Sequence, residues 1–295
     1  MRMHHALTLG TALLVLAGCG GHDDPPPGPP QDQTLNRLER AGQLAYALEH
    51  PAEAVAQYQS ALRQAEARDD LAAIGDLSFN LVVAELRANQ AAAALVTAQR
   101  ARAELLRRGA VPFPALDLAE ATALYRTGAA AEADALAATL QDNADQPTAF
   151  SASFLRGLIA DDAGNPERLR AALGRLNAPA GPAQQADRAE LGARVARRDG
   201  EMAQARSAAL QAADLRRVAL DYRGMARALA LAADAARLAG DRPAAADLFL
   251  RAGRSAAAQN DPETARAWLQ QAIDLTWDSA VADAAQAALD SLAEP

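Results

Sequence analysis

Alanine occupies 81 of the 295 positions, which is more than a quarter of the chain. Alanine is the strongest helix former, and its small side chain lets neighbouring helices approach closely. Aromatic residues favour β-strands, as β-branched residues do, and they make up only 4% of the sequence. The composition therefore predicts an all-α fold, in one large domain or two small ones.

The cationic side chains narrow the possible chemistry. All 29 of them are arginine, because the chain contains no lysine, and the formal net charge is -8. Without lysine there is no Walker-type phosphate loop, no Schiff-base enzyme and no lysine general base. The arginines alternate with acids and form no basic stripe, whereas phosphate neutralisation needs clustered cations, so we expect no nucleic-acid partner.

An apolar run near the N-terminus has the features of a targeting segment. Residues 6–18 carry no charge and follow the positive Arg2. A helix of this length spans about 20 Å, less than the roughly 30 Å hydrocarbon core of a bilayer. We therefore interpret residues 1–18 as a signal peptide rather than a membrane span. The run ends in Leu16-Ala17-Gly18-Cys19, and Cys19 is the only cysteine of the chain.

These four residues resemble the lipobox of bacterial lipoproteins. The resemblance implies cleavage between Gly18 and Cys19, diacylglycerol on the Cys19 sulfur and a further acyl chain, such as palmitate, on its nitrogen. Two or more acyl chains anchor a protein stably in a membrane. Gly20 is not the aspartate of inner-membrane retention, so the implied location is the outer membrane, facing the periplasm. The alternative is an ordinary secreted protein that is cleaved at an A-x-A-like site.

Residues 19–33 form the expected tether, which reads GGHDDPPPGPPQDQ after Cys19. Polyproline segments are stiff and extend by about 3.1 Å per residue, so this segment would hold a domain some 40 Å from the bilayer.

From residue 34 onward the chain repeats a stripe of small, large and small residues. The first stripe consists of Ala54, Tyr58 and Ala61. Related stripes begin at Ala94, Ala133, Leu169, Ala205 and Ala245, so their starts are separated by 40, 39, 36, 36 and 40 residues. A second pattern of large and small residues precedes the stripes. This regular spacing predicts stacked pairs of helices.

The two patterns resemble the first and second helices of the tetratricopeptide repeat, abbreviated TPR. The resemblance implies a right-handed α-solenoid of stacked helix-turn-helix units over residues 34–295, with about six units and a C-terminal capping helix. The repeat phase at the C-terminus stays open, because helices near 241–258, 261–276 and 278–293 fit either choice.

Turn residues agree with this division. Asn165, Asp261 and His50 each precede a proline and are expected to cap a helix. Four glycines fall where first helices should end, as C-terminal glycines do: Gly128, Gly164, Gly200 and Gly240. Residues 111–114 and 177–182 are rich in proline and are expected to connect repeats or to form a hinge.

The resemblance also implies a concave groove, lined by first helices, that binds a protein or peptide partner. Phe154 and Leu158 share one face and are either exposed anchors for that partner or core residues under the next unit. Trp268 and Trp277 are expected in the core or at the cap. The groove residues that the resemblance selects are Glu39, Gln43, Tyr46, Ser78, Val82, Glu85, Arg126, Phe154, Leu158, Asp161, Arg197, Asp234 and Arg237.

Little catalytic chemistry is expected. After processing, His22 and His50 are the only histidines and Cys19 is acylated, so catalytic triads, thiol catalysis and histidine-rich zinc sites are disfavoured. We expect no enzyme, no cofactor and no metal. Carboxylate pairs are the remaining route to a hydrolase. The candidate pairs are Asp69 with Asp70 and Asp161 with Asp162.

Together these features predict a membrane-anchored lipoprotein that acts as a TPR-like scaffold or adaptor in the cell envelope. Its partner would belong to the assembly of outer-membrane proteins, to pilus or secretion machinery, or to cell-wall machinery. The alternatives are a periplasmic hydrolase that uses acidic residues and a passive structural spacer.

Overall fold

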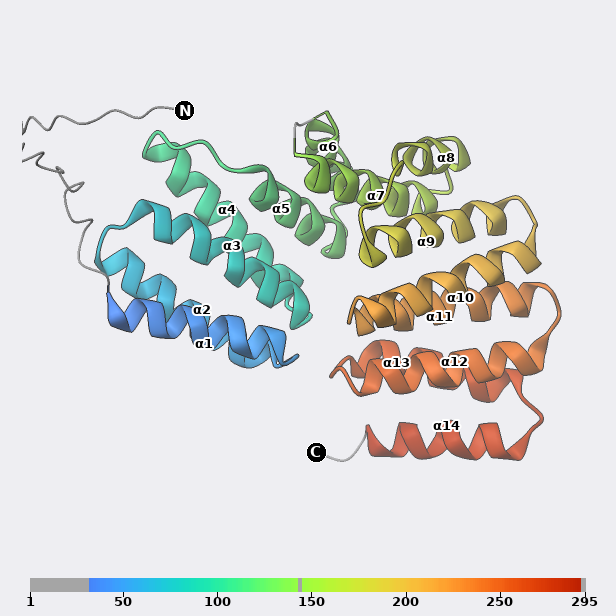
Figure 1. The fold of residues 1–295 in the computed structure, drawn as a ribbon. Coiled ribbons are helices and arrows are strands. Elements are labelled where there is room, and N and C mark those ends of the chain that lie inside the picture. The colour runs from blue at the N-terminus through green and yellow to red at the C-terminus, as the bar shows by residue number, and fades with distance from the viewer. Residues whose placement is uncertain (1–31, 143–144, 293–295) are drawn as a thin grey trace, which may run out of the picture.

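The computed structural model describes residues 32–142 and 145–292, in which fourteen α-helices and no strands are found. Consecutive helices pack against each other and form seven hairpins (Figure 1). This confirms the predicted all-α solenoid. The helices are α1 (Gln33–Ala47), α2 (Pro51–Ala67), α3 (Leu71–Arg87), α4 (Ala91–Arg107), α5 (Pro114–Arg126), α6 (Ala130–Leu140), α7 (Gln146–Asp162), α8 (Pro166–Arg175), α9 (Pro182–Arg198), α10 (Met202–Val218), α11 (Tyr222–Leu238), α12 (Arg242–Ala257), α13 (Pro262–Leu275) and α14 (Ser279–Ser291).

The first hairpin begins earlier than the composition indicated. Asp32 and Gln33 were assigned to the tether, but Gln33 starts α1 and Asp32 is its N-cap. Asp32 Oδ1 accepts hydrogen bonds from the backbone N–H groups of Thr34 at 2.8 Å and Leu35 at 3.1 Å. The signal segment, the lipobox residues Gly18 and Cys19, and the tether up to residue 31 lie outside the described residues.

The predicted helix ends follow from local turn chemistry. The side chains of Asn165 and Asp261 accept hydrogen bonds from the third backbone N–H after them, at 3.0 and 3.3 Å. His50 is the N-cap of α2, but its side chain makes no capping bond. The four predicted glycines follow the ends of α5, α7, α9 and α11, and all have positive φ values, between 66° and 88°. Glycine, which has no Cβ atom, adopts this conformation most readily, which confirms their role at helix ends.

The predicted stripes lie on the second helices of the first six hairpins. Their starting residues are at most 1% exposed: Ala54 on α2, Ala94 on α4, Ala133 on α6, Leu169 on α8, Ala205 on α10 and Ala245 on α12. Small side chains at these positions bring the helices together. In the first hairpin, a Cβ atom on Gly42 would lie 2.7 Å from Cε1 of Tyr58, so α1 and α2 touch there.

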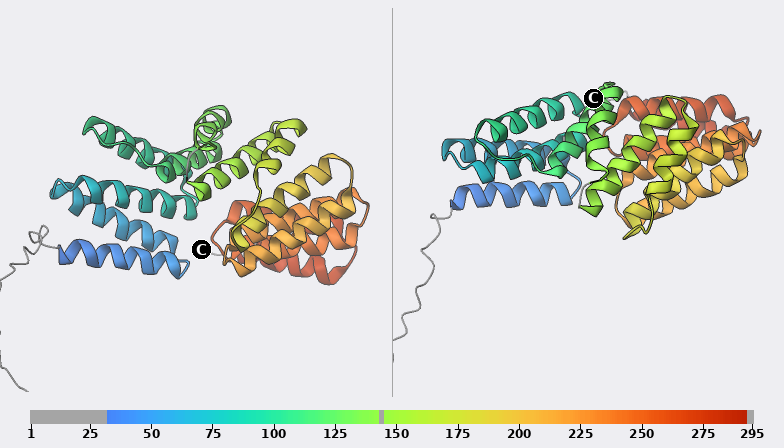
Figure 2. Two further views of the ribbon diagram at one scale, coloured as in Figure 1. Left: turned by 45° about the horizontal axis from the view of Figure 1, so that its top comes forward. Right: turned by 90° about the horizontal axis from the view of Figure 1, so that it is seen from above.

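The hairpins follow a tightly curved path, and the molecule has two arms. Helices α1 to α5 form one arm, α9 to α14 form the other, and α6 to α8 connect them (Figure 1). Helix ends of one arm face those of the other in the two views of Figure 2. Arg87 Nη2, at the end of α3, donates to the carbonyl oxygen of Leu220 in the α10–α11 turn, at 3.5 Å. The arms therefore touch across the inner side of the curve.

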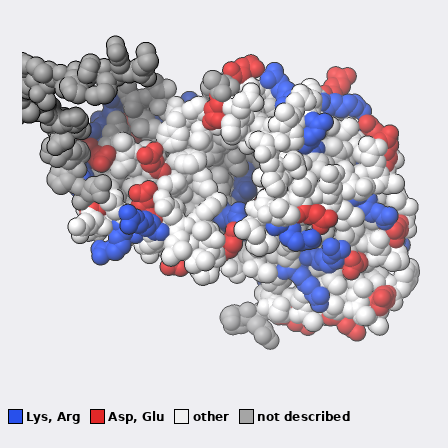
Figure 3. Space-filling model, in the orientation of Figure 1, with Lys and Arg blue, Asp and Glu red and all other residues white. Residues whose placement is uncertain are grey.

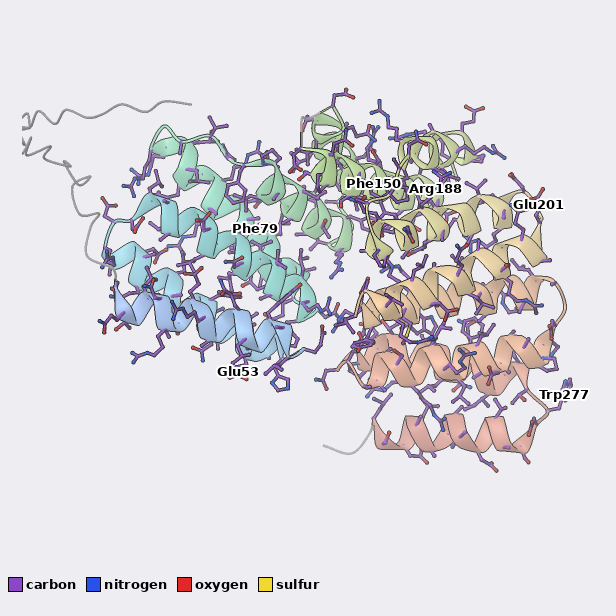
Figure 4. All side chains as sticks on the ribbon, in the orientation of Figure 1. Glu53, Phe79, Phe150, Arg188, Glu201 and Trp277 are labelled. Atoms are coloured by element: carbon purple, nitrogen blue, oxygen red, sulfur yellow. The ribbon has the colours of Figure 1, made fainter. Side chains whose placement is uncertain are left out.

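The two tryptophans differ in their surroundings. Trp268 packs partly buried against the C-terminal core. Trp277, which was expected in the core or at the cap, is 87% exposed on the α13–α14 connection and projects from the edge of the molecule (Figure 4). The guanidinium of Arg242 lies 5.4 Å from the centre of its ring. A cation–π contact, rather than burial, holds this ring.

Within residues 32–142 and 145–292, no helix combines the length and the apolar character that a membrane span needs. In the same residues, no three histidine, cysteine or acidic side chains come together as metal ligands would.

Candidate functional site

A buried carboxylate holds three arginines together on the inner side of the second arm. Glu190 of α9 is fully buried. It accepts hydrogen bonds from Arg227 of α11 at 2.8 and 3.0 Å, from Arg216 of α10 at 3.1 Å and from Arg194 at 3.2 Å. Burial alone would raise the pKa of Glu190, but the three arginines bring that pKa well below its ordinary value. Glu190 is therefore charged and ties three helices together.

A second carboxylate, Asp161 at the end of α7, is bound in the same way. It is 1% exposed and accepts from Arg194 at 2.8 Å, from Arg197 at 2.9 Å and from Arg198 at 2.7 Å. Burial alone would raise its pKa, but hydrogen bonds from Arg198 and Arg194 lower it. Its neighbour Asp162 is exposed and accepts from the hydroxyl of Tyr125. These contacts make Asp161 an anchor between α7 and α9.

Arg216 also binds two further acids. Its Nη2 atom donates to Asp187 at 2.6 Å and its Nη1 atom donates to Asp221 at 2.9 Å. Burial raises the pKa of Asp187 to about 6, and the charge of Arg216 opposes that rise. Asp221 caps α11 through the backbone N–H of Gly224. Arg216 thus fixes the α10–α11 turn beside the inner space of the molecule.

The inner space is a cavity of about 390 Å³, which we name the arginine cavity. Asp221 is the only carboxylate among its described lining residues. Figure 3 shows arginine atoms in the hollow between the two arms, whereas the rest of that face mixes both charges. The chain carries a formal charge of -8, so this concentration of cations is local. The arginines of the cavity are Arg87, Arg126, Arg194, Arg216, Arg223 and Arg227.

Two arginines of the cavity donate their hydrogen bonds to backbone carbonyl oxygens. Arg126 Nη1 donates to the carbonyl oxygen of Leu86 at 2.7 Å, and no ion pair of Arg126 is found among the described residues. Arg223 donates to the Gln259 carbonyl oxygen at 2.9 Å and lies 3.7 Å from Asp261. Burial lowers the pKa of both side chains, and nearby arginines lower it further. Arg126 as a whole residue is nonetheless exposed, so an incoming group can reach it.

Aromatic rings complete the wall of the arginine cavity. The guanidinium of Arg216 lies 5.5 Å from the centre of the Phe154 ring, and that of Arg87 lies 5.7 Å from the centre of the Tyr46 ring. Such contacts fix the arginine planes without using their hydrogen-bond donors. Arg87 is held further by Glu49, whose Oε2 accepts from Nε at 3.2 Å.

The structure brings four of the predicted groove residues together in the arginine cavity: Tyr46, Arg126, Phe154 and Leu158. Phe154 is half-buried, and Leu158 is buried although it lines the cavity. Leu158 is thus a core residue that also borders the cavity, and a role of Phe154 as an anchor for a partner stays a prediction.

Other predicted groove residues lie elsewhere. Glu39 accepts a hydrogen bond from Gln43 on the surface of α1, at 3.2 Å. Val82 is fully buried and packs in the core instead of a groove. Ser78 and Glu85 line a different crevice, between α2 and α4.

The remaining four predicted residues form two ion pairs with each other. Arg197 binds Asp161, and Arg237 pairs with Asp234 at 3.0 Å on the surface of α11. Glu190 and the arginines that bind it, Arg194, Arg216 and Arg227, were not selected from the sequence. One local signal was present, since Glu190 and Arg194 are spaced as an i, i+4 pair.

Comparison with known proteins yields neither a matching family model nor a matching curated protein. Three solved structures of TPR proteins are similar in fold. A tetratricopeptide repeat protein from Parabacteroides merdae is 16% identical and has a TM-score of 0.49, with 89% of this chain and 100% of that one covered. The C-terminal part of a TPR repeat-containing protein from Cytophaga hutchinsonii is 15% identical, with a TM-score of 0.43 and coverages of 83% and 98%. The TPR2AB domain of yeast Sti1, in complex with pHSP90, is 17% identical, with a TM-score of 0.35 and coverages of 88% and 96%. These likenesses concern the fold alone.

Proposed function

We propose that this chain is a scaffold protein that holds an acidic segment of a partner protein in the arginine cavity. The observation that carries the proposal is Arg126, whose guanidinium lies in the cavity with a carbonyl oxygen as its hydrogen-bond partner. An anionic side chain of the partner would supply the missing counter-charge. A charge-assisted hydrogen bond of this kind is about twice as strong as a neutral one.

Mutual repulsion among the arginines favours the same type of ligand. The neighbouring cations Arg227 and Arg223 are among the causes that lower the pKa of Arg126, after burial. A carboxylate placed between these side chains relieves that repulsion, and the partly desolvated surroundings strengthen the attraction. Ion pairs with buried acids hold Arg194 and Arg216 in place. The cavity is therefore organised before the ligand arrives.

The size of the cavity limits what can enter. About 390 Å³ is room for a few side chains, not for a folded domain. Tyr125, Phe154 and Leu158 give the wall an apolar part beside the cations. We therefore expect an extended acidic segment that also carries an apolar residue.

The test is the binding of fluorescein-labelled hexaglutamate to the full chain, measured by fluorescence anisotropy. Wild-type protein is expected to bind it, and Arg126→Gln is expected to bind it about tenfold more weakly, which corresponds to about 1.4 kcal/mol. Raising the salt concentration should weaken wild-type binding, because ions screen the arginines. Labelled hexaglutamine should not bind.

The matched control is Arg251→Gln. Arg251 lies on α12, is exposed and pairs with Asp247 at 3.4 Å, outside the arginine cavity. This variant is expected to bind hexaglutamate as the wild type does. Equal losses in both variants, or binding of hexaglutamine with the same affinity, would contradict the proposed site.

We further propose that the scaffold is a lipoprotein of the bacterial cell envelope, anchored through Cys19 and facing the periplasm. The support is the Leu16-Ala17-Gly18-Cys19 run at the end of an uncharged segment. Several acyl chains are needed for a stable anchor, because a single chain binds a membrane only weakly. The assembly in which the partner acts would then be an envelope one.

Replacing Cys19 by serine tests this location. The Cys19→Ser protein, expressed in a Gram-negative host, is expected to move from the membrane fraction to the soluble periplasmic fraction and to incorporate no labelled palmitate, because the hydroxyl is not the required lipid acceptor. Its processing should also become insensitive to globomycin. The control His22→Ala keeps the lipobox and should stay in the membrane fraction. A Cys19→Ser protein that remains in the membrane fraction would refute the anchor.

A further inference from the structure

A second, larger hollow lies on the other side of α3 from the arginine cavity. It is a crevice of about 810 Å³, lined by residues of α2, α3 and α4, which we name the α2–α4 crevice. Helix α3 supplies its floor through Ile74, Ser78, Leu81 and Glu85, which recur at helical spacing along one stripe. Arg87 faces the arginine cavity and is two residues from Glu85, or about 200° around the helix. The two sites are therefore separate.

Glu85 is the unusual residue of this floor. It is 3% exposed and forms a side-chain hydrogen bond with the hydroxyl of Thr97 on α4. Its Oε2 atom has no hydrogen-bond partner. Burial raises the pKa of this carboxyl group, and the bond with Thr97 offsets only part of the rise. A buried carboxyl oxygen without a hydrogen-bond donor is unfavourable, so a ligand that donates to it gains binding energy.

The walls beside Glu85 are apolar, and the charges of the rim are mostly paired. Leu62, Ile74, Leu81 and Val96 line the crevice, and Val96 is 66% exposed. On the rim, Arg107 pairs with Glu104 at 2.6 Å and Arg100 with Glu66 at 4.0 Å. The rim acid Asp69 pairs at 2.8 Å with Arg108, which does not line the crevice. The exposed Arg63 donates to the Ser60 hydroxyl.

We propose that the α2–α4 crevice binds a small aliphatic amine, whose ammonium group pairs with Glu85 while its hydrocarbon part covers the apolar walls. The volume lies in the range of small-molecule sites, 300–1,000 Å³, in which a few polar groups on an apolar wall fix the ligand. None of the three arginines that line the crevice pairs with Glu85, since Arg100 and Arg107 are bound to acids and Arg63 donates to Ser60. An ammonium ion is the group that supplies both the hydrogen-bond donor and the charge that Glu85 lacks.

The probe is n-hexylamine, with n-hexanol and n-hexanoate as comparators, titrated into the full chain by isothermal calorimetry at pH 8. We expect the amine to bind at least tenfold more tightly than the alcohol and the hexanoate to bind most weakly. Glu85→Gln keeps the size of the side chain and removes its charge. This variant is expected to lose at least tenfold in affinity for the amine and to leave the affinity for the alcohol unchanged.

Two further variants make the result decisive. Glu53→Gln changes an exposed acid of α2, labelled in Figure 4, that does not line the crevice, and it should bind the amine as the wild type does. Ala103→Trp places a large side chain at an exposed position of the crevice wall and should block the amine and the alcohol alike, even if Glu85→Gln were to fold poorly. Absence of amine binding to the wild type, equal affinity for Glu85→Gln, or preference for hexanoate would overturn the proposal.

Discussion

Replacing Glu190 by alanine is expected to lower the free energy of unfolding by about 3–5 kcal/mol, the usual cost of removing one partner of a buried ion pair. Glu190 is 0% exposed and binds Arg194, Arg216 and Arg227. Without it, these guanidinium groups repel each other in surroundings from which water is largely excluded. The measurement is urea denaturation followed by circular dichroism, with the transition midpoint compared between variants.

The control for this change is Asp247→Ala. Asp247 also pairs with an arginine, but both side chains are about half exposed, so solvent already stabilises the charges. Exposed pairs contribute about 0–1 kcal/mol, and the control should shift the midpoint little. If Glu190→Ala and Asp247→Ala shift the midpoint equally, the buried network does not hold α9, α10 and α11 together as we infer.

Loss of Glu190 should also act on the arginine cavity. Arg194, Arg216 and Arg227 line it, and their positions depend on the carboxylate behind them. The network is therefore both a source of stability and the support that points cations into the hollow.

The helices themselves could be predicted because their causes are local. Alanine content, the caps Asn165 and Asp261 and the glycines at the ends of α5, α7, α9 and α11 act within one helical turn. The repeated stripes were equally accessible, since a repeat protein uses the same contact between each pair of neighbours. The all-α solenoid follows from these features alone.

The curvature of the solenoid could not be predicted from these local features. It results from small rotations between successive hairpins, each set by side-chain packing, and these rotations accumulate along the chain. Their sum brings Arg87 to Leu220, which is 133 residues away in the sequence. The arginine cavity forms only where the arms meet, so no single repeat predicts it.

The direction in which the polar stripe of α3 faces also could not be predicted from the sequence. Ser78 and Glu85 were expected in the concave groove, but they line the α2–α4 crevice on the opposite side of α3. Polar residues normally face water, and both of these are buried. Periodicity identifies which residues share a stripe, whereas which neighbour covers that stripe depends on the packing of α2 and α4.

A pair of glycine substitutions tests how closely α7 and α9 pack. Gly157 of α7 faces Leu191 of α9, and a Cβ atom on Gly157 would lie 2.3 Å from Cδ1 and 2.9 Å from Cδ2 of that leucine. Leu191 is fully buried, so the close contact would lie inside the packed core. Gly157→Ala is therefore expected to lower the free energy of unfolding by about 1–3 kcal/mol or more, the cost of overpacking, although alanine is the better helix former.

The matched change is Gly192→Ala, one residue after Leu191 on α9. A Cβ atom on Gly192 would meet nothing within 4 Å, so only the helix propensity changes. This variant is expected to gain about 0.5–1 kcal/mol in stability. The same chemical substitution should thus have opposite signs at two positions, and thermal unfolding of both variants measures the difference. A stabilised Gly157→Ala protein would mean that α7 and α9 do not approach as closely as the contact with Leu191 requires.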